Sequence, residues 1–391
     1  MTRRLHFLPL CVIFFCNSLV FFAPAAILVR TRCGITLPQF FVLQAILSCG
    51  IFLFEIPCGW MTDRIGYKKS IILLQTLLAI TRIFFLVGGN FVFFVIEAVA
   101  EALGICFSSG TMESYIYESS GRSPEITVKR QSILSNFSES AFILSTLAFA
   151  PLSRFFSIEV LIALTLAASS VSLISAFFIP SFELRISKKC DFAHKSFFRK
   201  LIFDRNVIAL FLISSFTSLA EIVVNFVYIL KVQKIGLNPS WMTGLILAYT
   251  GLGLVTPLLV RHILKFRPAF FICASMTASA FLSALIGISS GLTALAPMIL
   301  LPFSISLAGL TYSALVNRIV DSMELEGNRA EIFSVLNQGS NLIQIVFLFA
   351  AGFVEKISLA GIFVCVAVML FFAALIPFCF RANQFFERLE D

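Results

Sequence analysis

Two glutamates and one arginine lie inside apolar stretches of the chain, where an ionised side chain is costly and therefore marks a functional candidate. Glu97 and Glu101 are four residues apart, so a helix places them one turn apart on the same face. Arg82 lies in the preceding apolar stretch at a matching depth. We expect Arg82 to pair with Glu97, which leaves Glu101 facing a polar cavity. The alternative is that all three form one buried structural network.

Further polar side chains occur in other apolar stretches. Glu221 is followed one helical turn later by Asn225, Glu139 lies in another stretch, and Asn17 lies midway along the first. A low-dielectric cavity favours the neutral form of a carboxyl group, so such a glutamate can exchange protons or bind a cationic substrate. The alternative for the asparagines is a hydrogen bond between helices.

These side chains must be positioned by membrane-spanning helices. Of the 391 residues, 59% are hydrophobic and 13% are charged, so a soluble domain of this length could not bury its apolar surface. A span takes about 20 residues, and the pattern predicts an all-α membrane protein with twelve spans. We place them near residues 5–28, 39–60, 70–88, 91–112, 132–151, 159–180, 207–230, 241–260, 269–288, 293–317, 334–353 and 358–380.

Lysine and arginine are distributed unevenly over the predicted loops. The N-terminus, the even-numbered loops and the C-terminus hold 22 of the 29, whereas the odd-numbered loops hold six, including Arg30 and Lys231. Because basic loops stay on the cytoplasmic side, both termini are predicted to be cytoplasmic, in an inner (plasma) membrane. The basic residues form no stripe, so we expect the lipid bilayer but no nucleic acid as a partner.

A basic connector separates two groups of six spans. We therefore predict an N-terminal six-helix bundle at 1–180, a cytoplasmic linker at 181–205 and a C-terminal six-helix bundle at 206–391. A short internal repeat supports this division, because similar segments open the fifth and eleventh spans. These segments are Arg130-Gln131-Ser132-Ile133-Leu134-Ser135 and Arg329-Ala330-Glu331-Ile332-Phe333-Ser334.

A charged, glycine-bracketed segment joins the second and third spans: Gly59-Trp60-Met61-Thr62-Asp63-Arg64-Ile65-Gly66-Tyr67-Lys68-Lys69. Its order, Gly-x-x-x-Asp-Arg-x-Gly-x-Lys-Lys, resembles the loop between helices 2 and 3 of the major facilitator superfamily. The segment from Ser109 to Glu118 is similar to the end of helix 4 in bacterial members, and Arg329 to Ser334 is similar to the start of their helix 11. The resemblance implies two pseudo-symmetric bundles that expose a central site to each side of the membrane in turn.

The resemblance also implies a gate on the cytoplasmic face. Asp63 would lie at the N-terminus of the helix that begins near Arg329, where the helix dipole favours a carboxylate. Arg64 would pair with Glu118 or Glu113 at the end of helix 4. Such contacts would hold the outward-open state and break when the inside opens. The alternative is a static clamp between the loops.

Other parts of the pattern carry their own expectations. Gly59, Gly66 and Lys68 complete the gate motif, whereas Tyr67 stands where the family usually has a base. In this fold helices 1, 4, 7 and 10 line the central cavity, which favours Asn17, Glu101 and Glu221 as lining residues. Drug–proton antiporters of the family usually have an arginine in helix 4 and a Gly-Pro motif late in helix 5, and this sequence has neither.

We therefore predict a secondary transporter that exports a small organic solute by alternating access, with protons coupled through Glu101 or Glu221. Proton-linked nutrient import is the alternative in the same fold, and a non-transporting membrane sensor or scaffold is the alternative from another class. The sequence contains no phosphate-binding loop, nucleophile–base pair or set of metal ligands. We expect neither an enzyme nor a cofactor or metal, and a monomer by default for the fold.

Overall fold

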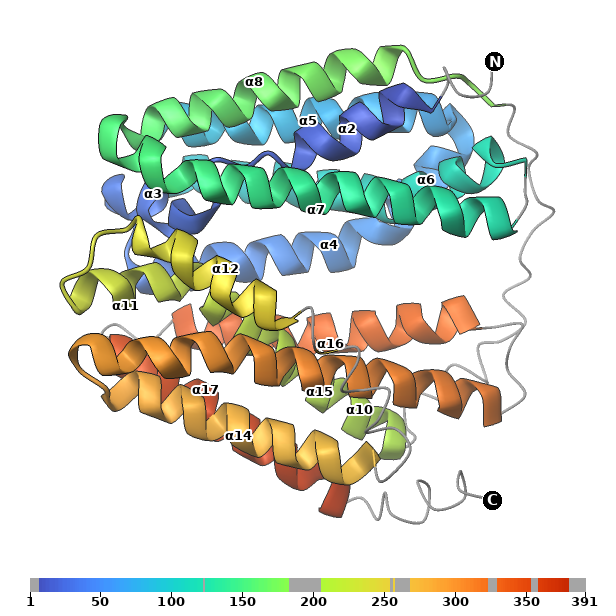
Figure 1. The fold of residues 1–391 in the computed structure, drawn as a ribbon. Coiled ribbons are helices and arrows are strands. Elements are labelled where there is room, and N and C mark those ends of the chain that lie inside the picture. The colour runs from blue at the N-terminus through green and yellow to red at the C-terminus, as the bar shows by residue number, and fades with distance from the viewer. Residues whose placement is uncertain are drawn as a thin grey trace. The chain divides into compact units, whose positions relative to one another are not determined.

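The computed structural model describes residues 7–121, 124–182, 205–253, 256, 268–322, 329–352 and 358–379. All regular structure in these residues is helical (Figure 1), which confirms the predicted all-α fold. By its contacts the chain divides into two compact units, Met1–Cys190 with Ala351–Phe353 and Asp191–Ala350 with Val354–Asp391. The predicted linker at 181–205 lies almost wholly outside the described residues.

The first unit contains the helices coloured blue to green in Figure 1. Within it α6 packs against both α4 and α5, α5 packs against α8, and α2 packs against α7 and α8. Its elements are α2 (Leu8–Ser18), the short 3-10 helix η1 (Ala23–Ala25), α3 (Ala26–Arg32), α4 (Leu37–Ile65), α5 (Tyr67–Val87), α6 (Phe91–Ser119), α7 (Pro124–Phe155) and α8 (Ile158–Phe177).

Small and hydroxylated residues bring α4 and α6 together. A Cβ atom added to Gly50 would lie 2.7 Å from the Cβ atom of Ala102, so the two backbones are too close for a larger residue there. The buried hydroxyls of Thr62 and Thr111 share a hydrogen bond of 2.9 Å. Close backbones and interhelical hydroxyl bonds are the usual means of joining helices in a membrane. Burial of apolar side chains contributes little there, because lipid is as apolar as a neighbouring helix.

The second unit contains the elements coloured yellow to red in Figure 1. In it α14 packs against α15 and α17, and α10 contacts the same two helices. Serine hydroxyls again join helices: Ser283 donates to the carbonyl of Phe363 at 2.8 Å. The elements are α10 (Arg205–Ile222), the π-helix η2 (Val223–Val227), α11 (Tyr228–Lys234), α12 (Trp241–Gly253), α14 (Pro268–Ile288), η3 (Gly291–Ala294), α15 (Leu295–Ser322), α16 (Arg329–Gly352) and α17 (Leu359–Cys379).

Ten helices among the described residues are long and apolar enough to cross a membrane. They correspond to ten of the predicted spans. The other two predicted spans, 241–260 and 334–353, correspond to α12, which is 13 residues long, and to α16, whose described apolar part is Asn341–Gly352. The count of twelve therefore stays a prediction.

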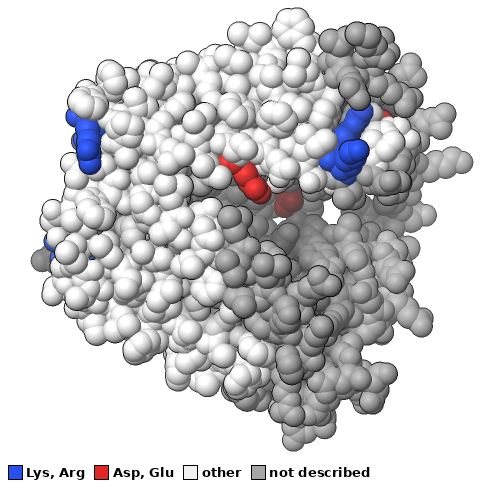
Figure 2. All heavy atoms as spheres, in the orientation of Figure 1, with Lys and Arg blue, Asp and Glu red and all other residues white. Residues whose placement is uncertain are grey.

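The surface of the helices is apolar, as a lipid-facing surface requires. Leucine, isoleucine, valine and phenylalanine side chains are exposed along both units, among them Ile56, Phe155, Phe270 and Val346. On the face shown in Figure 2 few of the described side chains are charged. The polar residues that remain inside the helices are therefore the ones to examine for function.

Candidate functional site

A buried ion pair joins α3 to α6 in the first unit. Arg30 Nη2 donates to Oε2 of Glu97 at 2.8 Å, and the two side chains are only 4% and 0% exposed. The guanidinium carbon of Arg30 also lies 4.9, 5.6 and 5.9 Å from the ring centres of Phe85, Phe40 and Phe94. A carboxylate and aromatic faces together stabilise a guanidinium away from water.

This pair corrects two expectations from the sequence. We expected Arg82 to pair with Glu97 or, as the alternative, Arg82, Glu97 and Glu101 to form one buried network, and we placed Arg30 in an external loop. In the structure Glu97 pairs with Arg30. The first predicted span, 5–28, ended too early. Helical structure continues as α3 to Arg32. A boundary placed by hydropathy alone ends a span at the first arginine, even where the helix continues.

Arg82 on α5 and Glu101 on α6 lie beside the pair. The guanidinium carbon of Arg82 lies 5.6 Å from the ring centre of Phe22, and its buried Nε has no hydrogen-bond partner in the described part of the chain. Glu101 interacts electrostatically with both Arg82 and Glu97. The two arginines and two glutamates therefore form one charge network, in which Arg82 and Glu101 are only half-buried.

The first span is interrupted next to Asn17. α2 ends at Ser18, and helical structure resumes only at η1, where Pro24 has no amide hydrogen to bond the carbonyl four residues earlier. Within the break, the backbone amide of Phe21 bonds to Thr165 Oγ1 on α8 at 3.0 Å. Interrupted spans leave polar groups at membrane depth, where they can line a binding site.

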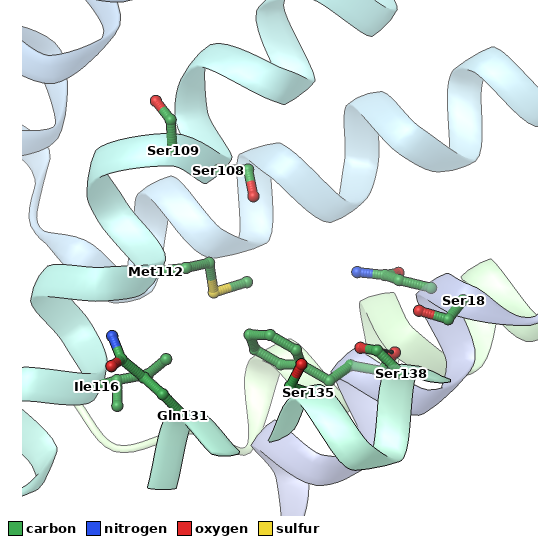
Figure 3. A pocket seen from close by; sticks show the side chains of 10 residues that line it. Ser18, Ser108, Ser109, Met112, Ile116, Gln131, Ser135 and Ser138 are labelled. Atoms are coloured by element: carbon green, nitrogen blue, oxygen red, sulfur yellow. Dashed lines mark hydrogen bonds between the residues drawn. The ribbon is translucent and has the colours of Figure 1, made fainter. Parts of the chain in front are cut away.

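A pocket of about 560 Å³ lies between α2, α6 and α7 beside this break. Figure 3 shows Met112 extending from α6 into the space, with Ser135 and Ser138 on the α7 side. Five serines, two amides and three apolar side chains line it, and none of these residues is charged. They are Phe14, Asn17, Ser18, Ser108, Ser109, Met112, Ile116, Gln131, Ser135 and Ser138.

Two predicted residues can be placed relative to this pocket. Asn17 lines it, and the buried Oδ1 atom of Asn17 has no hydrogen-bond partner among the described residues. Glu139 borders the pocket from one turn beyond Ser135, whose hydroxyl donates to Oε1 of the exposed Glu139 at 3.5 Å. We did not predict the serines; the signal available was the spacing of Ser135 and Ser138 on one helix face, with Gln131 a turn earlier.

In the second unit, Glu221 and Asn225 lie where the helix changes form. α10 ends one residue after Glu221, and the following five residues, which include Asn225, form the π-helix η2. Both side chains are exposed, although both lie near the middle of the span Leu212–Lys234. π-helical turns are frequent at functional sites, and a carboxylate at this depth requires a polar cavity or a counter-ion.

Lys231 is the second cation that we placed in an external loop and that the structure buries. Its Nζ atom donates to the carbonyl of Ser289 at 2.9 Å and to that of Gly287 at 3.5 Å, and the residue is only 4% exposed. These carbonyls lie at the C-terminal end of α14, where the helix dipole favours a cation. Lys231 therefore joins α11 to the end of α14.

The predicted gate segment is almost entirely helical. Gly66 alone separates α4 from α5, with φ 93° and ψ 151°, a backbone conformation that is essentially restricted to glycine. Asp63 and Arg64 lie in the last turn of α4, and Lys68 lies in the first turn of α5. The expected contact between Asp63 and the helix that begins at Arg329 would join the two units, and it stays a prediction.

Arg64 packs on an aromatic ring of its own helix. Its guanidinium carbon lies 3.6 Å from the ring centre of Trp60, one helical turn earlier. The expected pairing of Arg64 with Glu118 or Glu113 stays a prediction, and the side chain of Glu113 lies outside the described part. Gly59 lies in α4, where an added Cβ atom would meet nothing within 4 Å, so local packing does not require glycine there.

Two further side chains hold the neighbouring helix ends. Arg130, near the start of α7, donates to the hydroxyl of Ser119 at 2.9 Å and so connects the start of α7 to the end of α6. The hydroxyl of Tyr115 donates to the carbonyl of Pro180 at 3.0 Å, after the end of α8. Both residues belong to segments that we identified in the sequence, but their partners could not be assigned from it.

Comparison with known proteins gives both a family and a fold. The family model described as Major Facilitator Superfamily matches residues 10–337. The chain is similar to the solved structure of the nucleoside transporter NupG, with a TM-score of 0.73, 12% identity and coverage of 98% of this chain and 99% of that chain. It is also similar to the POT family transporter PepTSo, with a TM-score of 0.73, 13% identity and coverage of 97% and 98%.

A third similar structure is a D-xylose-proton symporter, with a TM-score of 0.70, 13% identity and coverage of 96% of this chain and 98% of that chain. No curated protein matches the sequence. At these identities the structural likeness shows the fold alone, whereas the family match spans most of the chain. The expectation of a multi-pass membrane transporter rather than an enzyme is thereby confirmed. This chain belongs to the Major Facilitator Superfamily.

Proposed function

We propose that this protein is a proton-coupled secondary transporter that exports a small organic solute by alternating access. The observation that carries the proposal is Glu221, an exposed carboxylate near the middle of a span, with one residue between it and the start of a π-helix. Lipid cannot solvate such a group, so water or a ligand must reach it. A carboxylate with changing access to water can load a proton on one side of the membrane and release it on the other.

Glu101 is the second candidate for proton coupling, and it lies in the other unit. It interacts electrostatically with its neighbours Arg82 and Glu97. Because Glu97 is already paired with Arg30, we assign it a positioning role and leave Glu101 as the exchangeable group of the network. Protonation of Glu101 would remove one of the two carboxylates that interact with Arg82, which would couple the proton to the packing of α5 and α6.

The proposed topology consists of two pseudo-symmetric six-helix bundles, at 1–180 and 206–391, joined by a cytoplasmic linker. A repeated design supports it. The first span of each half is irregular, through the break after α2 and through η2, and it ends at a glycine of positive φ, Gly34 (80°) or Gly236 (81°). A polar cap then starts the next segment: Thr36 accepts from the amide of Gln39, and Asn238 accepts from that of Ser240.

We further propose that both termini are cytoplasmic and that the membrane is a bacterial inner membrane. The charge count supports this orientation more strongly once burial is considered. Arg30 and Lys231 lie inside the units, so they no longer count as loop charges. The bias then becomes 22 cations in the proposed cytoplasmic segments against four in the opposite loops.

The test is transport into inverted membrane vesicles with an imposed pH gradient, screened over cationic dyes, antibiotics and metabolites. We expect accumulation of a compound that depends on the gradient. Glu221→Gln or Glu101→Gln should abolish it, whereas Glu159→Gln, which alters an exposed carboxylate at the start of α8, should not. Asp63→Asn alters the predicted gate and serves as a control in which the accumulation should also be lost. Unchanged pH-driven flux in both the Glu221→Gln and Glu101→Gln proteins would exclude the proposed coupling.

Proton-linked import of a nutrient is the second candidate. It is favoured by the similarity to a structure whose name describes a D-xylose-proton symporter. The two directions are separated by repeating the screen in right-side-out vesicles that are acidic outside. Uptake there, with no accumulation in inverted vesicles, would establish import and refute export.

A further inference from the structure

We propose that the pocket between α2, α6 and α7 binds a neutral, hydroxyl-rich solute of about the size of a sugar. The inference rests on the proposed transport function, because it names the class of solute that would be carried. Seven of the ten lining residues have hydroxyl or amide groups, and none is charged. Small-molecule pockets are usually mostly apolar with a few polar groups, so this composition itself indicates a polar ligand.

The absence of charge among the lining residues favours a neutral ligand over an ion. A charged solute that leaves water needs a counter-charge in the site. The carboxylate of Glu139 lies beyond Ser135 at the border, where it accepts the hydroxyl of Ser135 at 3.5 Å. The arginines and glutamates of the charge network do not line the pocket. A neutral solute loses less hydration and needs no such partner.

The hydrogen-bonding capacity of the wall matches hydroxyl groups. The hydroxyl of Ser138 donates to the carbonyl of Phe14 at 3.2 Å, which leaves its oxygen free to accept. Ser18 and Ser108 have no hydrogen-bond partner within the described part of the chain, so each can donate or accept. Asn17 has a buried oxygen without a hydrogen-bond partner in the described part of the chain. Rotating the amide group by a half-turn would put its nitrogen at the same place, so the position can either accept or donate. A ligand hydroxyl donates and accepts at one atom and therefore suits all of these groups.

The remaining wall fits the carbon skeleton of such a solute. Met112 extends into the pocket in Figure 3, and Phe14 and Ile116 complete the apolar side. The carbon-bound hydrogens of a sugar ring can pack on these side chains while its hydroxyls face the serines. The volume of about 560 Å³ exceeds that of a monosaccharide and leaves room for bridging waters. A wholly apolar ligand would displace water from the polar groups without replacing its hydrogen bonds.

The test uses the purified full-length protein in lipid nanodiscs. Thermal unfolding is followed with D-xylose, D-glucose, mannitol and uridine as neutral probes, and with glucosamine and glucuronate as charged counterparts of glucose. We expect a saturable rise in unfolding temperature with at least one neutral probe and a weaker effect of both charged sugars. Asn17→Leu and Ser108→Ala should each raise the apparent dissociation constant roughly tenfold, the loss of about one hydrogen bond. Ser170→Ala, at an exposed site on α8, should leave it unchanged.

A change of charge gives a second readout that a structural defect would not produce. Ser108→Asp adds a carboxylate to the pocket wall, and it should shift preference from glucose towards glucosamine. Two results would overturn the inference: folded wild-type protein that none of the four neutral probes stabilises, or wild-type protein that prefers either charged sugar.

Transport measurements separate this inference from the proposed function. Counterflow of a neutral probe in proteoliposomes without a pH gradient reports on the pocket alone, whereas accumulation driven by a pH gradient reports on coupling. Counterflow that Asn17→Leu weakens, with no pH-driven accumulation, would support the pocket and refute proton coupling. Proton-driven flux of a cation that is insensitive to Asn17→Leu and Ser108→Ala would support coupling and refute the neutral ligand.

Discussion

Replacing Glu97 with leucine should destabilise the first unit severely, because it leaves Arg30 charged and without its carboxylate. Both side chains are buried, at 4% and 0% exposure, and the bond is 2.8 Å long. Removing one partner of a buried pair costs about 3–5 kcal/mol. For a unit of this size 1 kcal/mol corresponds to about 2–4 °C in Tm, so the Tm should fall by roughly 6–20 °C.

An exposed ion pair nearby provides the matched control. Arg32, two residues after Arg30, lies 3.9 Å from Glu159, and these side chains are 58% and 57% exposed. Exposed pairs contribute about 0–1 kcal/mol, so Glu159→Leu should change the Tm by at most a few degrees. Unfolding can be followed with a thiol-reactive dye, because Cys58 and Cys106 are buried free thiols in the same unit.

The double variant decides between loss of a pair and general damage. Arg30→Met with Glu97→Leu removes both charges and keeps much of the volume, so it should recover most of the stability that Glu97→Leu loses. The two single effects should therefore exceed the double effect by several kcal/mol. Equal losses for Glu97→Leu and Glu159→Leu, or strictly additive effects in the cycle, would refute the assignment.

Three further substitutions test individual contacts by thermal unfolding of the purified protein. Gly66→Ala should cost about 1–3 kcal/mol, because φ 93° and ψ 151° suit only glycine; an unchanged Tm would contradict this turn. Lys231→Met should cost about 1.5–3 kcal/mol through loss of the charged bond to Ser289, and Lys234→Met should cost less; similar losses would refute the burial of Lys231. Tyr115→Phe should cost about 1 kcal/mol, the bond to the carbonyl of Pro180.

Local patterns in the sequence were sufficient to predict an all-helical membrane protein. Runs of about 20 apolar residues are long enough to cross a bilayer, whatever their neighbours are, because every backbone group is paired within its own helix. The turn at Gly66 was equally predictable, since a glycine between two apolar runs permits a conformation that other residues avoid. The ends of the membrane spans were less predictable, because Arg30 and Lys231 lie in helices that we ended too early.

The partners of polar side chains depended on tertiary structure. The depth of Glu97 along its helix could be counted from the sequence, and that depth suited Arg82. Whether Arg82 or Arg30 reaches Glu97 depends on the rotation of each helix and on the break after α2, which no local pattern specifies. The pocket likewise depends on tertiary structure. Taken singly, its serines do not differ from other serines in helices, and they form a polar wall only because α2, α6 and α7 turn those faces towards one space.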